Sequence, residues 1–162
     1  MSNAIEKTLD IKSELKWPND ITVSGKKVAG MLVDASLESN KIENMVLGVG
    51  INFNVDVKQI EKMLKDTPNF YGVASLSEQN KTIKPILLVQ TFLIELEKIC
   101  TRLNSKDTKK IIRDWTVRSS TIGQNVELNT KEGKIKGRAI KIDVDGALVI
   151  SENKKNVRVI EG

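Results

Sequence analysis

Three short stretches of the sequence combine groups that can do chemistry with residues that leave room for a ligand. In Lys-Trp-Pro-Asn-Asp at 16–20, the proline favours an extended turn that projects two short polar side chains. Lys-Lys-Val-Ala-Gly-Met-Leu-Val at 26–33 starts an expected strand with lysines and contains a glycine, which in a strand commonly marks a bulge or the close approach of a ligand. Gly-Val-Gly-Ile-Asn at 48–52 alternates two glycines, so that one face of the strand is clear for a flat apolar molecule.

The residue types limit the chemistry further. The chain has no histidine and one cysteine, Cys100, which excludes Ser-His-Asp and Cys-His catalysis, histidine metal ligands and an intrachain disulfide. The Gly-x-Gly at 48–50 is not followed by a helix start, so it does not predict a phosphate-binding loop. Catalysis would therefore rest on Lys, Arg, Asp, Glu, Asn and backbone amides.

Composition indicates an ordinary globular protein of one domain or two small ones. Its 162 residues are 40% hydrophobic and 29% charged. No apolar run approaches the roughly 20 residues that span a bilayer, and the N-terminus lacks a signal-peptide pattern, so we expect a cytoplasmic protein without a membrane partner. The net charge of +5 is spread along the chain, and all aromatic residues precede the C-terminal strands, so we expect no nucleic-acid partner.

The elements that would position the three stretches follow from apolar periodicity. Residues 2–9 resemble the end of a helix, and residues 57–64 have helical spacing before a loop-like segment at 65–80. Ser24-Gly25 predicts a hairpin turn, and the nearly all-apolar run at 42–51 predicts a strand covered on both faces. The strands expected in this part of the chain are 14–17, 21–23, 26–35 and 42–51.

Two further helices follow. The first begins near Pro85, and its apolar spacing predicts a stripe of side chains that faces the core and includes a buried structural thiol. The stripe is Ile86, Val89, Leu93, Leu96, Cys100 and Leu103. The second, at about 108–118, turns Ile111, Ile112 and Trp115 inward.

Short alternating strands then predict a small C-terminal β domain. The strands are 125–129, 134–142, 147–150 and 157–160, with turns at 131–133, 145–146 and 153–154. We therefore expect an α+β fold with a mixed sheet over residues 1–120, followed by a small SH3-like β-barrel over residues 121–162.

Taken together and in this order, the three motifs closely resemble the central part of biotin protein ligases. The C-terminal stretch, with Trp115, Ser119, Gly123 and the expected strands, is similar to the C-terminal domain of that family. The resemblance implies a fold related to class II aminoacyl-tRNA synthetases. It also implies an enzyme that uses ATP and Mg²⁺ to convert biotin to biotinyl-5′-AMP and then passes the biotinyl group to a lysine of a biotin carrier domain.

The resemblance also implies roles for individual residues. Lys27 matches the lysine that contacts the biotin carboxylate and the acyl phosphate, which makes it the expected catalytic residue. Four positions are expected to line the biotin site beside Lys27: Gly30, Leu32, Gly48 and Gly50. Five are expected at ATP: Lys16, Trp17, Asn19, Asp20 and Asn52. Of these, Asp20 and Asn52 would supply oxygen ligands to Mg²⁺.

The front of the family pattern is not found in this sequence. No Gly-Arg-Gly-Arg loop is present, and the only Gly-Arg pair is Gly137-Arg138. We therefore expect a C-terminal subunit or fragment that works with the N-terminal half of the ligase, and a sheet with an exposed edge. Two alternative functions stay open, a non-catalytic regulatory or assembly module and a relative of the lipoate or octanoate ligases. Formation of a homodimer through sheet edges also stays open.

Overall fold

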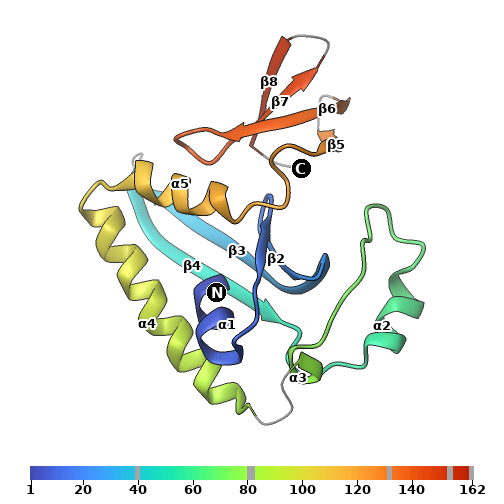
Figure 1. The fold of residues 1–162 in the computed structure, drawn as a ribbon. Helices are drawn as coiled ribbons and strands as arrows, with labels where there is room; N and C mark the ends of the chain where they lie inside the picture. The colour runs from blue at the N-terminus through green and yellow to red at the C-terminus, as the bar shows by residue number, and fades with distance from the viewer. Residues whose placement is uncertain (39–40, 80–82, 131–132, 153–154, 161–162) are drawn as a thin grey trace.

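The computed structural model describes residues 1–38, 41–79, 83–130, 133–152 and 155–160. It shows a sheet covered by helices and, beyond helix α5, a smaller second sheet (Figure 1). Two of the predicted turns, at 131–133 and 153–154, fall wholly or partly outside the described residues. Within the described part of the chain, no helix is long and apolar enough to span a membrane.

The first sheet is an antiparallel meander. Its strands are β1 (Glu14–Lys16), β2 (Asp20–Val23), β3 (Lys26–Glu38) and β4 (Lys41–Ile51), paired in that order. Ser24 and Gly25 both have positive φ, which suits the two-residue turn between β2 and β3. All strand pairs of this sheet are antiparallel, so the prediction of a mixed sheet is wrong. Among the described residues, parallel pairing is confined to the isolated bridges Leu15–Ser119 and Lys27–Val73.

Helices cover one face of this sheet. α1 (Ser2–Leu9) and α4 (Pro85–Asn104) pack against each other and, with the strands, enclose a core. Its buried side chains include Ile5, Ile21, Ala29, Leu88 and Phe92. α2 (Val57–Leu64) and the single turn α3 (Leu76–Gln79) lie to one side, beyond the end of β4 (Figure 1). The opposite face of the sheet carries the glycines of the second and third motifs.

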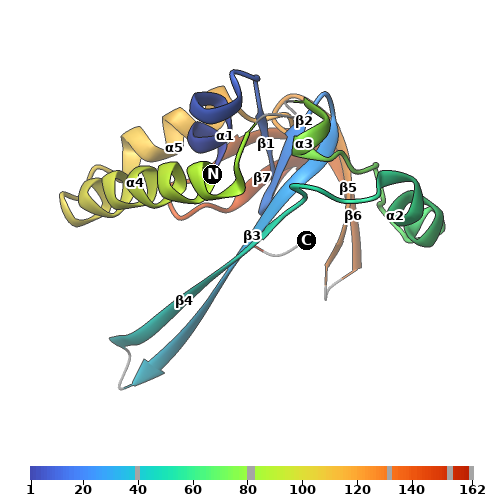
Figure 2. The same cartoon turned by 90° about the horizontal axis from the view of Figure 1, so that it is seen from below.

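The far half of the β3–β4 hairpin projects from the body of the molecule (Figure 2). Leu32, Val33, Met45 and Val46 are all more than half exposed there. The prediction that residues 42–51 form a strand covered on both faces is therefore wrong, because the helices reach only the base of the hairpin.

Helix α4 packs through a different face from the one predicted. Its buried side chains are Leu88, Phe92 and Glu95, whereas Ile86, Leu93, Leu103 and most of the predicted inward stripe are exposed. Cys100 is exposed as well, so the prediction of a buried structural thiol is wrong. The helix carries two apolar stripes, and the one that includes Leu88 and Phe92 contacts the sheet.

The C-terminal strands form a second antiparallel meander after α5 (Thr108–Val117). The strands are β5 (Asn125–Thr130), β6 (Gly133–Ile142), β7 (Leu148–Glu152) and β8 (Lys155–Val159), in sequence order. Among the described residues β5 and β8 do not pair, so the sheet is open and not the closed barrel that the sequence predicted. Side chains from the first unit close its core instead, namely Trp17, Ile112 and Trp115.

Candidate active site

The register of the first sheet gathers four of the predicted biotin-site residues on one face. Gly30 lies between Asp20 of β2 and Gly50 of β4, and Leu32 lies opposite Gly48. Directly paired residues of antiparallel strands project to the same face, and so do residues two apart along one strand. The three motifs therefore meet on the sheet face that carries no helix.

An ion pair between Lys27 and Asp20 stands at the end of this face. Lys27 Nζ lies 2.6 Å from Asp20 Oδ1, with the lysine side chain 39% exposed and the aspartate side chain 15% exposed. Gly30 makes room for the pair, because a Cβ there would lie 3.1 Å from Asp20 Oδ1 and 3.2 Å from Lys27 Nζ. The lysine and the carboxylate predicted from different motifs are thus in direct contact, over a glycine.

Tyr71 completes this charged group, although no motif in the sequence pointed to it. Its hydroxyl donates a hydrogen bond to Asp20 Oδ2 at 2.7 Å, and the ammonium of Lys16 lies 3.2 Å from the centre of its ring. Burial, together with the hydrogen bond to Asp20, raises the pKa of Tyr71, so the phenol stays protonated and donates. Burial also lowers the pKa of Lys16, against the opposing effect of the Asp20 charge.

Asn52 and Asn19 support the strands that carry the site. The side-chain amide of Asn52 donates to the carbonyl of Lys27 at 3.0 Å, and its backbone N–H donates to Val28 at 2.8 Å. The carbonyl of Asn19 accepts from the N–H of Met31 at 2.9 Å. The structure thus gives Asn52 a part in holding the start of β3, and its predicted contact with Mg²⁺ stays a prediction.

Trp17 belongs to the second core. Its indole N–H donates to the carbonyl of Gly146 at 3.1 Å, and its backbone N–H donates to the hydroxyl of Thr121 at 3.0 Å. Trp17 is buried among side chains that include Leu148 and Ile150. These contacts give the indole a packing role between the two units, and its predicted contact with ATP stays a prediction.

The open face offers space beside the ion pair. A Cβ at Gly48 would meet only Leu32 O at 3.7 Å, and one at Gly50 only Gly30 O at 3.9 Å. Among the described residues, no side chain therefore lies within 4 Å of either Cβ position. Leu32 is 69% exposed, so its side chain is free to contact a ligand that lies there.

The predicted contact of Asp20 with Mg²⁺ stays a prediction, since Asp20 is the one carboxylate that the described part of the site offers for it. Among the described residues no group of three or more His, Cys, Asp or Glu side chains could hold a metal ion. Asp20 supplies one carboxylate, and both of its oxygens are engaged, by Lys27 and by Tyr71. Mg²⁺ in proteins is commonly held by one or two carboxylates together with phosphate oxygens and water, which matches a single aspartate.

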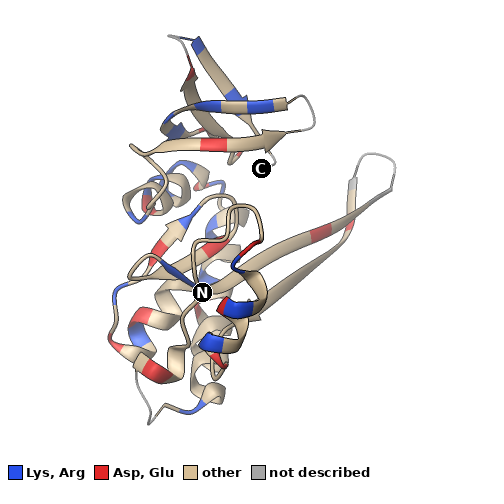
Figure 3. Cartoon of the chain, turned by 90° about the vertical axis from the view of Figure 1, so that its right-hand side faces the viewer, with Lys and Arg blue, Asp and Glu red and all other residues tan. Residues whose placement is uncertain are grey.

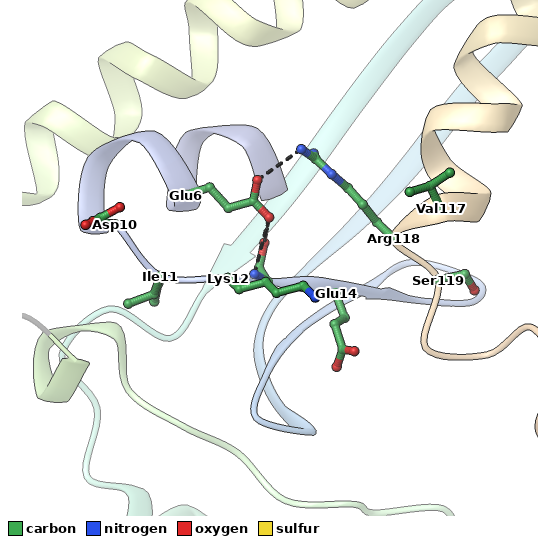
Figure 4. A pocket seen from close by; sticks show the side chains of 9 residues that line it. Glu6, Asp10, Ile11, Lys12, Glu14, Val117, Arg118 and Ser119 are labelled. Atoms are coloured by element: carbon green, nitrogen blue, oxygen red, sulfur yellow. Dashed lines mark hydrogen bonds and ion pairs between the residues drawn. The ribbon is translucent and has the colours of Figure 1, made fainter.

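Two cavities lie close to the first motif. The larger, of about 640 Å³, is bordered by Lys16, Asn19 and Asp20 on one side and by α1, α4 and α5 on the other. Its volume is within the range of ligand sites. Three of the predicted ATP residues line this one cavity. The smaller, of about 500 Å³, lies where Glu6 of α1 and Arg118 form an ion pair at 3.0 Å, and no predicted site residue lines it (Figure 4).

Positive and negative side chains are interspersed over the described surface (Figure 3). Lys98, Lys134 and Arg158 each lie within ion-pair distance of a carboxylate. The expected absence of a nucleic-acid partner stays a prediction.

Family profiles match both ends of the chain. The profile described as "Biotin/lipoate A/B protein ligase family" matches residues 1–52, and the profile described as "Biotin protein ligase C terminal domain" matches residues 121–162. The chain belongs to the biotin protein ligase family. Every site residue predicted from the sequence lies within residues 1–52, and Tyr71 lies outside both matches. The division at residues 120 and 121 stays a prediction.

Individual relatives agree with this family. The chain is 30% identical over 150 residues to the bifunctional ligase/repressor BirA of Bacillus subtilis, covering 93% of the chain and 45% of that protein. It is 23% identical over 138 residues to the biotin–[acetyl-CoA-carboxylase] ligase of Paracoccus denitrificans, covering 84% of the chain and 55% of that protein. The chain therefore spans about half the length of the curated relatives it matches.

Solved structures show the same fold. The biotin protein ligase of Aquifex aeolicus superposes with a TM-score of 0.78 at 24% identity, over 99% of this chain and 67% of that one. The same enzyme in complex with biotin and ATP gives a TM-score of 0.78 at 23% identity, over 99% and 64%. The α+β arrangement followed by a C-terminal β unit is therefore that of a biotin protein ligase.

Proposed function

We propose that this chain supplies the lysine-bearing part of a biotin protein ligase site. The reaction would be ATP-dependent formation of biotinyl-5′-AMP, followed by transfer of the biotinyl group to a lysine of a biotin carrier domain. The N-terminal half of the catalytic domain would act with it. The observation that carries the proposal is the 2.6 Å contact between Lys27 and Asp20 over Gly30, at the end of an open, glycine-lined sheet face.

The residues suit the first step. A biotin carboxylate oxygen attacks the α-phosphorus of ATP and pyrophosphate leaves, so negative charge gathers around phosphorus. Lys27 Nζ lies 3.2 Å from the position of a Cβ at Gly30, and its ammonium would contact both the carboxylate and the phosphoryl oxygens of ligands lying above that glycine. Mg²⁺, when bound, would neutralise charge on the phosphates. In this proposal Asp20, which contacts Lys27, would orient that lysine and contribute to holding the ion, and Lys16, which lies over the Tyr71 ring, would contact the phosphates.

The second step needs positioning and little acid–base chemistry. The amine of the carrier lysine attacks the acyl carbon of biotinyl-5′-AMP and AMP leaves, with the amine proton passing to solvent or to phosphate. Lys27 would hold the departing phosphate by charge. Leu32, Gly48 and Gly50 would hold the apolar ring system of biotin against the strands, since no described side chain lies within 4 Å of a Cβ at either glycine and Leu32 is exposed.

The exposed hairpin supports a role for a partner polypeptide. β4 is an edge of the first sheet, and the apolar side chains of the hairpin are exposed on both of its faces. Exposed strand edges and large apolar patches commonly mark sites of association. The N-terminal half of a ligase would pair with this edge and enclose the reactive anhydride, and a second copy of the chain is the competing occupant.

The test is the intact mass of a biotin carrier domain after incubation with biotin, Mg-ATP and this chain. Parallel reactions include or omit a polypeptide that supplies the N-terminal half of the catalytic domain. Lys27→Ala is compared with Lys26→Ala, since Lys26 is the neighbouring lysine and pairs with Glu61 on the surface. We expect the gain of one biotinyl group when both halves are present, its loss in Lys27→Ala, and full retention in Lys26→Ala.

Other results point elsewhere. No gain in any reaction, with both halves folded, would contradict the ligase proposal and favour an assembly or regulatory module that uses the exposed hairpin. Transfer of lipoyl or octanoyl groups in preference to biotinyl would favour a lipoate ligase relative. Equal activity of Lys27→Ala and the unsubstituted chain would remove Lys27 from the mechanism.

A further inference from the structure

We propose that Tyr71 is a positioning residue of this site, which holds Asp20 by its hydroxyl and Lys16 by its ring so that Lys27 is aimed over Gly30. The effect of Tyr71 on catalysis rests on the proposed function. The positioning of Lys27 by Tyr71 can be measured without any catalysis. No profile match covers Tyr71, and it lies 51 residues from Asp20 along the chain.

The contacts of Tyr71 divide into two kinds. The hydroxyl donates to Asp20 Oδ2 at 2.7 Å while the other oxygen of that carboxylate meets Lys27 at 2.6 Å. The carboxylate therefore has a contact at each oxygen, a hydrogen bond from Tyr71 and an ion pair with Lys27, and the hydrogen bond restricts the orientation in which it meets the ammonium. The ring face meets the ammonium of Lys16 at 3.2 Å, a contact that depends on the ring alone.

The backbone places Tyr71 against the same strand that carries Lys27. The N–H of Lys27 donates to the carbonyl of Gly72 at 3.1 Å, and the N–H of Ala74 donates to the carbonyl of Lys27 at 2.9 Å. Gly72 has a φ of +98°, a conformation that few residues other than glycine adopt readily. The segment is therefore tied to residue 27 directly beside Tyr71, and movement of Lys27 and of Tyr71 is coupled.

This arrangement explains how three charges share a small site. Lys16 and Lys27 are both cations near Asp20, and their mutual repulsion contributes to the lowered pKa of Lys16. Tyr71 contacts both ends of this group, because its ring lies against the Lys16 ammonium and its hydroxyl donates to the carboxylate oxygen that Lys27 does not contact. Lys16 thus has a contact with the ring, and Lys27 contacts Asp20 over Gly30.

Two substitutions separate the two kinds of contact. Tyr71→Phe removes the hydroxyl and keeps the ring, whereas Tyr71→Leu removes both. Phe70→Leu is the control, since it removes a ring from the same loop without removing a hydrogen bond to Asp20. The measurement is nuclear magnetic resonance of lysine ammonium groups in the full chain, read as the rate at which their protons exchange with water. Folding of each variant is checked from its amide spectrum.

We expect Tyr71→Phe to raise the exchange rate of the Lys27 ammonium by at least about threefold, because a hydrogen bond to a charged group is worth more than that factor. The Lys16 signal should change in Tyr71→Leu and stay unchanged in Tyr71→Phe. Phe70→Leu should alter neither. Unchanged Lys27 exchange in folded Tyr71→Phe would overturn the proposal, as would an equal change in Phe70→Leu.

Catalysis provides the second readout. With both halves of the ligase present, Tyr71→Phe should lower kcat about tenfold and leave KM for biotin within about twofold, since orientation is lost while the apolar face is intact. If the ammonium signals change as expected and the unsubstituted chain transfers no biotin, the proposed function fails and the positioning stands. If the unsubstituted chain transfers biotin and the signals do not change, the positioning fails alone.

Discussion

Replacing Glu95 by glutamine should destabilise the protein at neutral pH and have much less effect in acid. Glu95 lies on the buried side of α4 with a side chain only 8% exposed. It accepts hydrogen bonds from Lys7 at 2.8 Å, Lys98 at 2.7 Å and Asn3 at 3.0 Å. Lys7 and Asn3 belong to α1, so this carboxylate joins the two helices that cover the first sheet.

The size of the effect follows from the pKa. Hydrogen bonds from Lys7 and Lys98 lower the pKa of Glu95 from 4.5 to about 2, which is at most about 3 kcal/mol of stabilisation by the ionised form. The two lysines are 56% and 58% exposed, so solvent screens the interaction, and we expect about 1–2 kcal/mol. Because the pKa is lowered on folding, this stabilisation is complete above pH 4.5 and is lost as the pH falls towards 2.

The assay is urea unfolding of the unsubstituted protein and of Glu95→Gln at several pH values between 7 and 2.5. The free energy of unfolding should differ by about 1–2 kcal/mol at pH 7, and the difference should shrink steadily below pH 4.5. Taking the difference between the two proteins cancels the other carboxylates, which titrate in both. A constant difference across this range would refute the reasoning, because it would show that the charge of Glu95 contributes nothing.

Two further substitutions test the packing around the site. Gly30→Ala should displace Lys27 from Asp20, because the new Cβ would lie 3.1–3.2 Å from both side chains. Biotinyl transfer should therefore fall at least about tenfold, while the midpoint of urea unfolding changes little. Trp17→Phe should lower the free energy of unfolding by about 1–3 kcal/mol, since it leaves the partly buried carbonyl of Gly146 without the indole donor and opens a cavity. Equal transfer by Gly30→Ala in the mass assay, or an unchanged urea midpoint for Trp17→Phe, would contradict these two assignments.

Local sequence signals predicted where the helices and strands lie. Ser24-Gly25 marks a two-residue turn, Pro85 begins α4, and the run from 57 to 64 has helical spacing, and each of these appears in the structure. Such signals depend on backbone preferences within a few residues, which the sequence states directly. They also bring the three motifs to neighbouring strands, because a meander of short connections leaves little choice of pairing.

What the sequence could not predict depends on contacts between distant residues. α4 has two apolar stripes, and periodicity alone does not say that Leu88 and Phe92 face the sheet while Leu93 faces out. The far half of strand 42–51 is apolar without being covered, because the helices reach only the base of the hairpin. Tyr71 stands in a loop with no motif, and only the pairing of Gly72 and Ala74 with Lys27 brings it to Asp20.

Trp17 has a consequence for how the chain can be divided. It precedes Asp20 by three residues, yet its side chain completes the core of the C-terminal sheet, and Thr121 and Gly146 hold it there. If the chain were divided at residue 120, the indole of Trp17 would be exposed on the N-terminal fragment, and the core of the C-terminal sheet would lack that side chain. The two units thus follow each other in sequence but share a core, and the residue that joins them lies three positions from the carboxylate of the site.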